Sequence, residues 1–309
     1  MKNSFILALQ NESLQMLRGV EKGDFHNHIS RGGTIKKYRE ELGVPLCDKP
    51  LKFDGYNGME SWYAANIRKY FDNTVYLQRI KMALQHMVSD GIKIAVVTYG
   101  IKELSLFDSY DEFVERQKEL FNEYAPNIQL IPEFGINTNE NSEEIERGIT
   151  NVLKLNFFKS IDIHGPEMTD PCVYKKIYSR AYAYGLKLRA HVGETGEPEV
   201  IKIALKELEL EEINHGNKAV LDVTVIKEIL RRNIRVNLCP YSNIYLGIYN
   251  SLKEHPIRIL YDYGINLTIG TDDMLIFNKS ISEIFLDLYQ QQVFSSQELD
   301  GIRNNALKF

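Results

Sequence analysis

The chain has few cysteines, with three among its 309 residues, and only seven histidines. Cys47, Cys172 and Cys239 are odd in number and form no CxxC pair, which argues against a disulfide framework and favours a reducing compartment. The apolar N-terminal segment FILAL is too short for a secretory signal or a membrane span. We therefore expect a cytoplasmic protein that has no membrane partner.

A basic excess is also absent, since the formal net charge is −5. This balance argues against a nucleic-acid polymer as a partner, although local donors can still hold a small anion. The apolar and charged fractions, 44% and 26%, are those of a globular protein with a sizeable core. No internal repeat, linker or low-complexity segment is visible, so we expect one domain over residues 1–309. The sequence leaves the oligomeric state open.

Short β-rich apolar runs alternate with longer helical patterns, which predicts a parallel sheet with helices between its strands. We expect eight strands, at 23–28, 92–100, 128–136, 159–165, 186–193, 212–217, 234–240 and 265–272. Helices are expected at 74–90, 109–124, 142–157, 200–208 and 221–233, together with an amphipathic helix at the N-terminus. The most economical closure is a (β/α)8 barrel (a TIM barrel), whose active-site groups lie at the C-terminal strand ends.

An insertion at residues 43–73 separates the first two predicted strands and carries aromatic residues such as Tyr56 and Trp62. Long segments of this kind between barrel elements often serve as lids or pocket walls. The insertion is therefore expected to form a lid over the pocket or, alternatively, to cover the barrel rim.

The scarce histidines gather at the predicted strand ends. His26 and His28 stand two apart in the first strand, so both side chains point the same way. His191 ends the fifth strand, His215 the sixth and Asp272 the eighth. In a closed barrel these ends form one ring, which makes distant residues neighbours. An HxH pair alone more often has a structural role, but the other groups at the remaining strand ends make a metal centre the prediction.

Neutral imidazoles and a carboxylate without thiolate suit one catalytic Zn²⁺ with an open coordination position, although iron and manganese are also compatible. Cys239 in CPYSN is expected to be a buried strand-end thiol, with a ligand role as the alternative. Glu194 and Asp273, close in sequence to the predicted ligands, form a second set of reactive groups.

Six segments in order, GDFHNHI, IDIHGPE, HVGET, INHGN, NLCPYSN and HPIRILYDYGINLTIGTDD, resemble the adenosine deaminase family. This family includes adenosine, adenine and AMP-type deaminases on a zinc-bearing (β/α)8 barrel. The resemblance spans about residues 22–278, although residues 35–158 contribute little to it. It implies hydrolysis of the 6-amino group of an adenine nucleoside or nucleotide, with zinc held by His26, His28, His191 and Asp272.

The resemblance also implies roles for four further positions. Glu194 would give a proton to ring nitrogen 1, His215 would orient the attacking hydroxide, Asp273 would bond ring nitrogen 7, and the Gly165 backbone would meet ring nitrogen 3. Attack on an aromatic ring requires such protonation, which a carboxylic acid with a raised pKa can supply. A helix N-cap is the alternative for Asp273 and a simple turn is the alternative for Gly165.

The three remaining histidines receive no catalytic role, and His86 is expected on a helix surface. His164 is expected to point away from the site, and His255, before Pro256, is expected to start a helix.

The chain departs from the family just after the HxH pair. Where many members carry an apolar residue, then an acidic or amide residue and Gly, this chain reads Ile29-Ser30-Arg31-Gly32. Backbone amides near a helix start, together with an Arg and hydroxyls, can hold a phosphate. We therefore interpret Ser30 and Arg31 as substrate-binding residues suited to AMP or dAMP. The alternative is an ordinary strand-to-helix turn with an exposed Arg.

Two other functions are less compatible with these residues. A two-metal amidohydrolase or phosphoester hydrolase would need a carboxylated lysine at the end of the fourth strand, where this chain has His164 and Gly165. A deaminase-like nucleotide sensor would be expected to lose Glu194, His215 or a ligand, and all of them are present. The sequence therefore favours a small-molecule purine as partner and deamination as the reaction.

Overall fold

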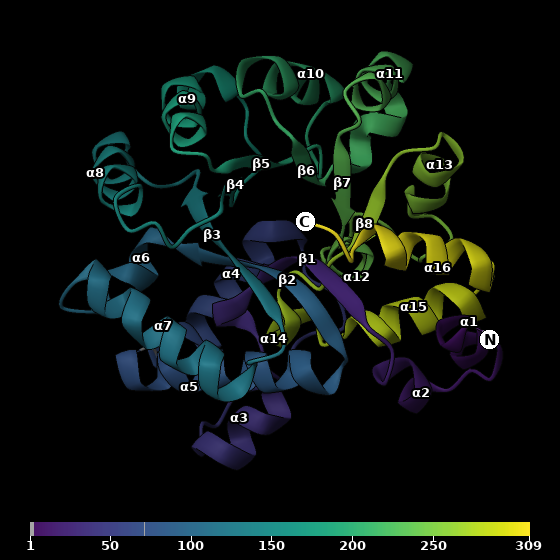
Figure 1. Ribbon diagram of the computed structural model, residues 1–309, viewed down its shortest axis with the longest axis horizontal. Helices are drawn as coiled ribbons and strands as arrows, with labels where there is room; N and C mark the ends of the chain where they lie inside the picture. The colour runs from purple at the N-terminus through teal and green to yellow at the C-terminus, as the bar shows by residue number, and fades with distance from the viewer. Residues whose placement is uncertain (1–2, 71) are drawn as a thin grey trace.

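The computed structural model describes residues 3–70 and 72–309, and eight parallel strands form its centre. Each strand pairs with the next in chain order, as the predicted barrel requires. A bridge between Asn27 and Asp272 joins the first strand to the segment after the last. The first and last strands therefore lie side by side (Figure 1). The strands are β1 Lys22–His28, β2 Ile92–Gly100, β3 Gln129–Asn137, β4 Ser160–His164, β5 Lys187–Val192, β6 Glu212–His215, β7 Arg235–Leu238 and β8 Leu267–Ile269.

Helices surround these strands and connect them, which confirms the (β/α)8 TIM barrel (Figure 1). The α-helices are α1 Ser4–Gln10, α2 Leu14–Arg18, α3 Ile35–Leu42, α4 Gly55–Asn66, α5 Asn73–Ser89, α6 Ile101–Leu104, α7 Tyr110–Tyr124, α8 Ser142–Val152, α9 Lys175–Ala183, α10 Pro198–Glu207, α11 Val223–Arg231, α12 Pro240–Tyr245, α13 Ile257–Asp262, α14 Met274–Phe277, α15 Ile281–Gln290 and α16 Ser296–Asn305. Four short 3₁₀ helices are η1 Ile29–Arg31, η2 Arg68–Tyr70, η3 Pro171–Tyr174 and η4 Asn217–Leu221.

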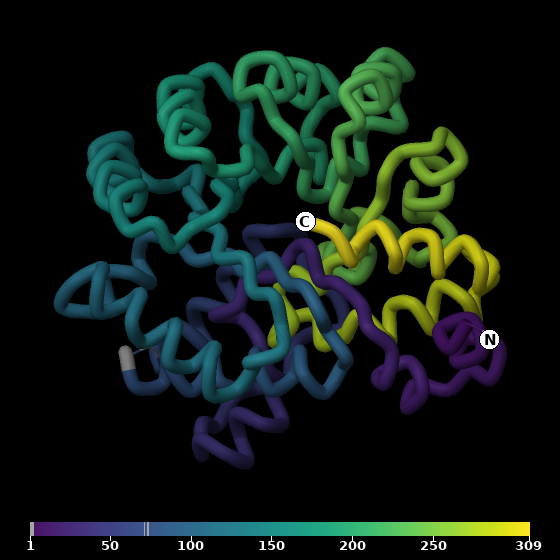
Figure 2. Tube along the Cα trace, viewed as in Figure 1, coloured from purple at the N-terminus to yellow at the C-terminus, as the bar shows by residue number. Residues whose placement is uncertain are grey.

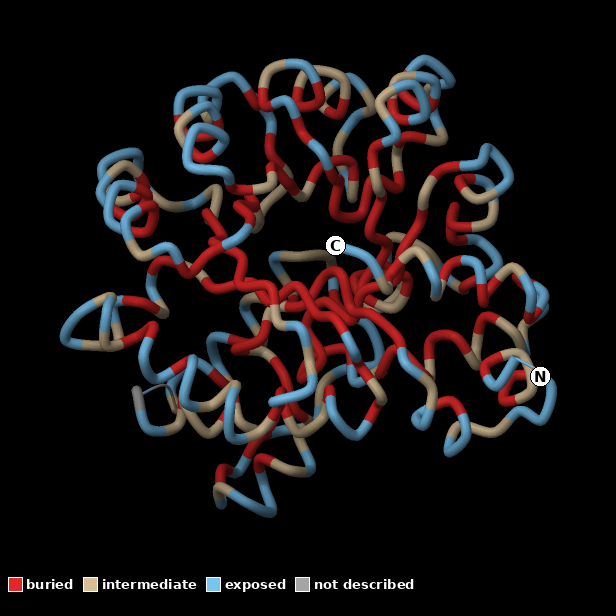
Figure 3. Tube along the Cα trace, in the orientation of Figure 1, coloured by how far each residue is buried: buried red, intermediate tan, exposed pale blue. Residues whose placement is uncertain are grey.

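The strands are buried on both faces, as expected for a parallel sheet covered by helices. In β2 the run from Ile94 to Tyr99 is buried throughout, and Figure 3 shows the same burial along the central strands. Charged side chains inside the barrel are paired between strands. Arg189 in β5 pairs with Glu133 in β3 and Glu212 in β6, and Lys187 and Arg235 give Glu212 further positive partners.

Local sequence explains where several helices begin and end. The Asp72 carboxylate accepts from the Val75 amide at the start of α5, and the Ser280 hydroxyl and Glu283 form a capping box on α15. The predicted helix at 142–157 ends at Val152, and Asn156 beyond it has a φ of 48°, which a continuing helix does not allow.

The N-terminal helices and the final helices lie side by side. The predicted N-terminal amphipathic helix forms as α1 and α2, and α1 packs against α15 and α16 (Figure 2). Buried Phe5 meets the Phe285 ring edge-on at 5.1 Å between centroids. No helix among the described residues is long and apolar enough to cross a membrane.

The insertion at 43–73 folds as α4 and η2 and has an apolar cluster of its own. Buried Met59 and Tyr63 from α4 pack with Tyr38 of α3, Leu246 after α12 and Phe277 of α14. This cluster attaches the insertion to the segments that follow β1, β7 and β8. The insertion therefore covers the C-terminal end of the barrel, where the active-site groups of such folds lie.

Candidate active site

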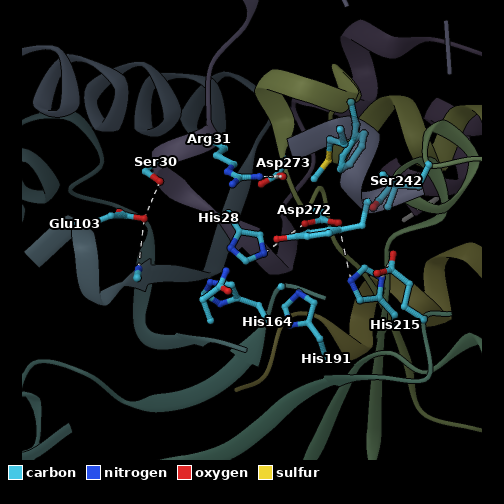
Figure 4. A pocket seen from close by; sticks show the side chains of 18 residues that line it. His28, Ser30, Arg31, Glu103, His164, His191, His215, Ser242, Asp272 and Asp273 are labelled. Carbon is cyan, nitrogen blue, oxygen red and sulfur yellow. Dashed lines mark hydrogen bonds and ion pairs between the residues drawn. The ribbon is translucent and has the colours of Figure 1, made fainter. Parts of the chain in front are cut away.

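A pocket of about 620 Å³, including its open mouth, lies at the C-terminal ends of the strands. All of the site residues predicted from the sequence line it except His26, which is fully buried. Figure 4 shows His28, Asp272, His191 and His215 gathered around one centre, with Ser30, Arg31 and Glu103 farther along the same pocket. Barrel closure thus brings together groups that are distant in the sequence, such as His26 and Asp272, which are 246 positions apart.

The predicted metal ligands form one compact cluster. Donor atoms of His26, His28, His191 and Asp272 all lie within 4.8 Å of one another. Oδ1 of Asp272 is 3.6 Å from Nε2 of His26 and 3.5 Å from Nε2 of His28. Ligand bonds of about 2.1 Å in a tetrahedral arrangement would place neighbouring donors about 3.4 Å apart. The spacing therefore fits a single shared ion.

The chemistry of these donors also fits a metal. Both ring nitrogens of His26 are buried without a hydrogen-bond partner among the described residues. Burial lowers the pKa of His26 and of His28, which keeps both imidazoles in the neutral form that binds a metal. A buried, unpartnered imidazole beside a carboxylate is costly unless a ligand completes it, so this structure supports a cation site.

Two buried carboxylates support the cluster from outside. Oδ2 of Asp162 in β4 lies 2.8 Å from Nδ1 of His191, an outer contact that orients the imidazole and strengthens it as a ligand. Asp24 in β1 accepts from the backbone and hydroxyl of Thr271, at 3.1 and 2.6 Å, directly before Asp272. Asp272 itself has a φ of 59°, a left-handed conformation that these contacts hold in place.

Cys239 lies close to this cluster, at the end of β7. His215, Cys239 and Asp272 also form a compact group that could hold a metal. Burial, however, raises the pKa of the Cys239 thiol well above its ordinary value, which favours the protonated form. The predicted four-ligand set therefore remains the better centre, and Cys239 is a buried thiol at its edge.

Glu194 and His215 stand next to each other at the wall of the pocket. Oε1 of Glu194 lies 3.4 Å from Nδ1 of His215, and Nε2 of His215 lies 3.9 Å from Oδ2 of Asp272. Burial, with the nearby charge of Asp272, raises the pKa of Glu194 to about 8. A carboxyl group in this state can act as a general acid at neutral pH.

Asp273 occupies the N-cap position of α14, but its side chain makes no capping hydrogen bond there. Instead Oδ2 accepts from Nη1 of Arg31 at 2.8 Å, and Oδ1 is buried without a hydrogen-bond partner among the described residues. Burial, opposed by Arg31, raises the pKa of Asp273 to about 7. The geometry thus favours an interaction between Asp273 and a ligand over the N-cap alternative.

Gly165 and His164 end β4 at the pocket. Gly165 has a φ of 108°, and a Cβ there would lie 2.9 to 3.1 Å from the Asn137 side chain, so only glycine fits. The expectation that His164 points away was wrong, because its side chain lines the pocket 5.2 Å from the His28 ring (Figure 4). Asp162 and His164 are two apart on one strand, and both therefore face the interior.

The far end of the pocket contains a carboxylate that the sequence reasoning missed. Ser30 donates its hydroxyl to Oε1 of Glu103 in α6 at 2.9 Å, and Oε2 of Glu103 accepts from the Tyr76 hydroxyl at 2.9 Å. Arg31 is shared between Asp273 and Glu60 of α4, the latter at 2.7 Å. The donors interpreted as phosphate ligands therefore already contact protein carboxylates.

Comparison with known sequences assigns the family. The sequence profile described as adenosine deaminase matches residues 79–309, about three quarters of the chain. The chain belongs to the adenosine deaminase family. This deaminase is thus an enzyme, a metal-dependent hydrolase that acts on adenine-type amino groups.

Two curated relatives are similar to this deaminase over different shares of their length. A Treponema pallidum (strain Nichols) protein named as an adenosine/adenine deaminase is 27% identical over 280 residues, covering 90% of this chain and 94% of the relative. An adenine deaminase of Marinomonas sp. (strain MWYL1) is 31% identical over 144 residues, covering 47% of this chain and 42% of the relative. The similarity to the second protein is therefore limited to less than half of each chain.

Solved structures share the fold of this deaminase. Adenine deaminase from Arthrobacter aurescens superposes with a TM-score of 0.81 at 19% identity, covering 93% of this chain and 92% of the other. The N6-methyl-AMP deaminase of Arabidopsis thaliana gives 0.79 at 16% identity, with coverage of 95% and 93%. A Burkholderia ambifaria amidohydrolase with bound Zn gives 0.75 at 16% identity, covering 96% and 87%.

Proposed function

We propose that this enzyme uses one Zn²⁺ to hydrolyse the 6-amino group of an adenine nucleoside, giving an inosine-type product and ammonia. One observation carries the proposal: three members of the four-ligand cluster line the same pocket as Glu194 and Asp273, whose Oδ1 has no hydrogen-bond partner among the described residues. Family membership supports the adenine-type amino group as the point of attack.

The side chains of this pocket match the demands of the reaction. His26, His28, His191 and Asp272 would hold the zinc ion, which would supply a hydroxide nucleophile at neutral pH, because zinc lowers the pKa of water from about 16 to about 7. As oxygen adds to carbon 6, Glu194 places its proton on ring nitrogen 1, and the ring accepts the electron pair there. The proton of the added hydroxyl group then moves to the amino group, the bond from carbon 6 to the amino nitrogen breaks, and ammonia leaves as carbon 6 becomes a carbonyl.

Other residues hold the ring and the nucleophile in place. His215 lies between Glu194 and Asp272, where its imidazole can orient the attacking oxygen. A protonated Asp273 can donate through its free oxygen to ring nitrogen 7, and the raised pKa of Asp273 favours that form. The Gly165 backbone has no side chain to block its approach to ring nitrogen 3.

The surroundings of Ser30 and Arg31 favour an unphosphorylated substrate. The pocket continues past the base-binding residues to Ser30, Glu103 and Asn137, which leaves room and polar groups for a sugar. Glu103 and Glu60 flank the donors that a 5′-phosphate would need. A phosphate there would meet two carboxylates, whereas a sugar hydroxyl can donate to one of them.

A substrate panel tests this function. Purified protein supplied with one equivalent of Zn²⁺ should release ammonia from adenosine and deoxyadenosine, with a matching change in purine absorbance. We expect kcat/KM for AMP to be lower by about tenfold or more, since an unpaired phosphate would be desolvated beside carboxylates. Free adenine should react more slowly than the nucleosides, because it leaves the far end of the pocket unfilled.

The outcomes separate the two parts of the proposal. If no adenine compound is deaminated by zinc-loaded protein, the function itself fails. If AMP is the best substrate and Glu103→Gln does not change the ratio of AMP to adenosine turnover, only the choice of substrate fails. Glu103→Gln leaves the four proposed metal ligands in place. The metal content of every sample is therefore measured as the control.

A further inference from the structure

Behind the Glu194 carboxylate lies a buried chain of polar side chains to which the proposed chemistry gives no role. Asn243 in α12 is fully buried and donates Nδ2 to Oε1 of Glu194 at 2.6 Å. Its Oδ1 accepts from Nδ2 of Asn217 at 2.8 Å and lies 2.9 Å from Nε2 of His255. These groups come from the segments that follow β5, β6 and β7, so the barrel closes them around one amide.

The tautomer of His255 determines how this amide points. The Ile257 backbone amide donates to Nδ1 of His255 at 3.1 Å, so Nδ1 carries no proton and the proton of the neutral ring is on Nε2. Burial lowers the pKa of His255 to about 3, which keeps the ring neutral. Nε2 therefore donates to Asn243, and two donors converge on Oδ1. The NH₂ group of Asn243 must then face Glu194.

This orientation distinguishes the two oxygens of Glu194. Asn243 donates to Oε1, and Nδ1 of His215 lies 3.4 Å from the same atom. A neutral carboxyl group carries its proton on one oxygen, and an oxygen that already accepts an N–H is the poorer place for it. Among the described residues, the contacts of the Glu194 carboxylate fall on Oε1.

We propose that Asn243, oriented by His255 and Asn217, is a positioning residue that holds Oε1 of Glu194 as an acceptor and leaves Oε2 to carry the proton to ring nitrogen 1. The inference rests on the proposed function, because it concerns the same proton transfer. Asn243 acts through Glu194: among the described residues its side chain forms hydrogen bonds with Glu194, Asn217 and His255, and it is not one of the residues that line the pocket. The sequence gives no hint of this link, since Asn243 and His255 are 49 and 61 positions from Glu194.

The first test compares variants at Asn243 and at Gln117. Asn243→Ala should lower kcat by about 10- to 100-fold and leave KM within about twofold, because proton transfer is misaligned while the base still binds. Metal content should match that of the wild type. Gln117→Ala is the control: Gln117 is a buried amide in α7 that accepts from the Tyr99 hydroxyl at 3.1 Å and does not line the pocket. That variant should keep its kcat.

The second test uses His255, whose substitution leaves Asn243 in place. His255→Gln keeps an N–H donor and should retain most of kcat, whereas His255→Leu should lose about fivefold, the worth of one hydrogen bond. The double variant His255→Leu/Asn243→Ala should be no slower than Asn243→Ala alone, since both substitutions act through the contact between Asn243 and Glu194. The comparison of His255→Gln with His255→Leu decides the matter even if Asn243→Ala does not fold.

Two readouts do not depend on the rate. Imidazole ¹H–¹⁵N spectra of metal-free protein should show His255 as the neutral Nε2–H tautomer from about pH 5 to pH 8. In His255→Leu, the alkaline limb of the pH profile of kcat should move upward, because a weakened donor stabilises the Glu194 carboxylate less.

Several outcomes would overturn the inference. These are an unchanged kcat in Asn243→Ala, losses that multiply in the double variant, an Nδ1–H tautomer for His255, and equal loss in His255→Gln and His255→Leu. A wild-type enzyme that deaminates no adenine compound would instead overturn the proposed function, and the tautomer of His255 would still be measured.

Discussion

The two ends of the pocket are built in different ways. At the metal end, His26, His191 and Asp272 come from or directly follow barrel strands, and buried Asp162 and Asp24 hold them from behind. At the far end, contacts are made between short segments and the insertion. In the proposed function, the barrel strands therefore hold the reacting groups, and the rim contacts the part of the substrate beyond the base.

The rim depends on one shared cation. Arg31 in η1 donates to Asp273 and pairs with Glu60 of α4, and its guanidinium lies 4.1 Å from the centroid of the Tyr63 ring. These partners belong to segments that carry their own apolar cluster. Loss of one rim contact should therefore change binding, whereas loss of one contact at the metal end should stop the reaction.

Removing a metal ligand should give the largest effect. Asp272→Asn keeps a residue type that tolerates the φ of 59° and removes the charge from the cluster. We expect bound zinc to be lost and kcat/KM to fall by about four orders of magnitude. Metal analysis and initial rates measure both. Full activity in metal-free protein would show that the cluster is not the reaction centre.

Removing the proton donor should give the next largest effect. Glu194→Gln keeps the size of the side chain and the Asn243 contact, but it can no longer give a proton to the ring. We expect kcat to fall by about 10²- to 10⁴-fold with unchanged metal content. The matched control is Glu197→Gln, an exposed carboxylate three positions away. Near-normal turnover in Glu194→Gln would remove its role as an acid.

The outer carboxylate should matter less than a ligand. Asp162→Asn keeps the shape of the side chain but weakens the 2.8 Å contact with Nδ1 of His191. Zinc affinity should fall by about 10- to 100-fold, measured by competition with a chelator. Excess zinc should restore much of the rate. An unchanged zinc affinity would mean that Asp162 contributes to the polar contacts inside the barrel and not to metal binding.

The pH dependence follows from the acid form of Glu194. Its pKa is raised to about 8, so the group is protonated below that pH and ionised above it. Activity should therefore fall as pH rises through the pKa, while Glu194→Gln should lose this alkaline limb. Rates across the pH range at saturating zinc and substrate would show the difference. A limb that persists in Glu194→Gln would belong to another group.

The smallest effect is expected at the rim. Glu60→Gln breaks one of the two ion pairs of Arg31 and frees part of its charge. We expect KM for adenosine to change by about two- to fivefold with kcat preserved, and AMP to become relatively better. Glu41→Gln on α3, whose partner Lys37 lies 3.9 Å away at the surface, provides a control. A large loss of kcat in Glu60→Gln would place the rim within the catalytic machinery.

The same division explains what could be predicted from the sequence. Strand periodicity and the positions of His26, His191 and Asp272 were enough for the barrel and the cluster, because barrel closure makes all strand ends neighbours. The same periodicity would have placed His164 in the pocket, since it stands two residues after Asp162. The expectation for His164 was wrong because it did not take into account the position of that residue relative to Asp162.

Other features depend on tertiary contacts that no local pattern encodes. Glu103 reaches the pocket from α6 because β1 and β2 are adjacent, and Asn243 meets Glu194 because β5 to β7 are neighbours. Taken without their partners, the donors Ser30 and Arg31 predicted an anion site. The carboxylates that they contact in the structure, Glu103 and Asp273, are distant from them in the sequence. Local residue type thus identified the groups but not their partners.

The seam of the barrel lies at the proposed metal centre. The His28 amide donates to the Asp272 carbonyl at 3.1 Å, and the Asp272 amide donates to the His26 carbonyl at 2.9 Å. These backbone hydrogen bonds between β1 and the segment that follows β8 are therefore made by the proposed ligand residues. A cation bound there would fasten the two edges of the sheet together, and amide exchange at His28 and Asp272 would slow as the site fills.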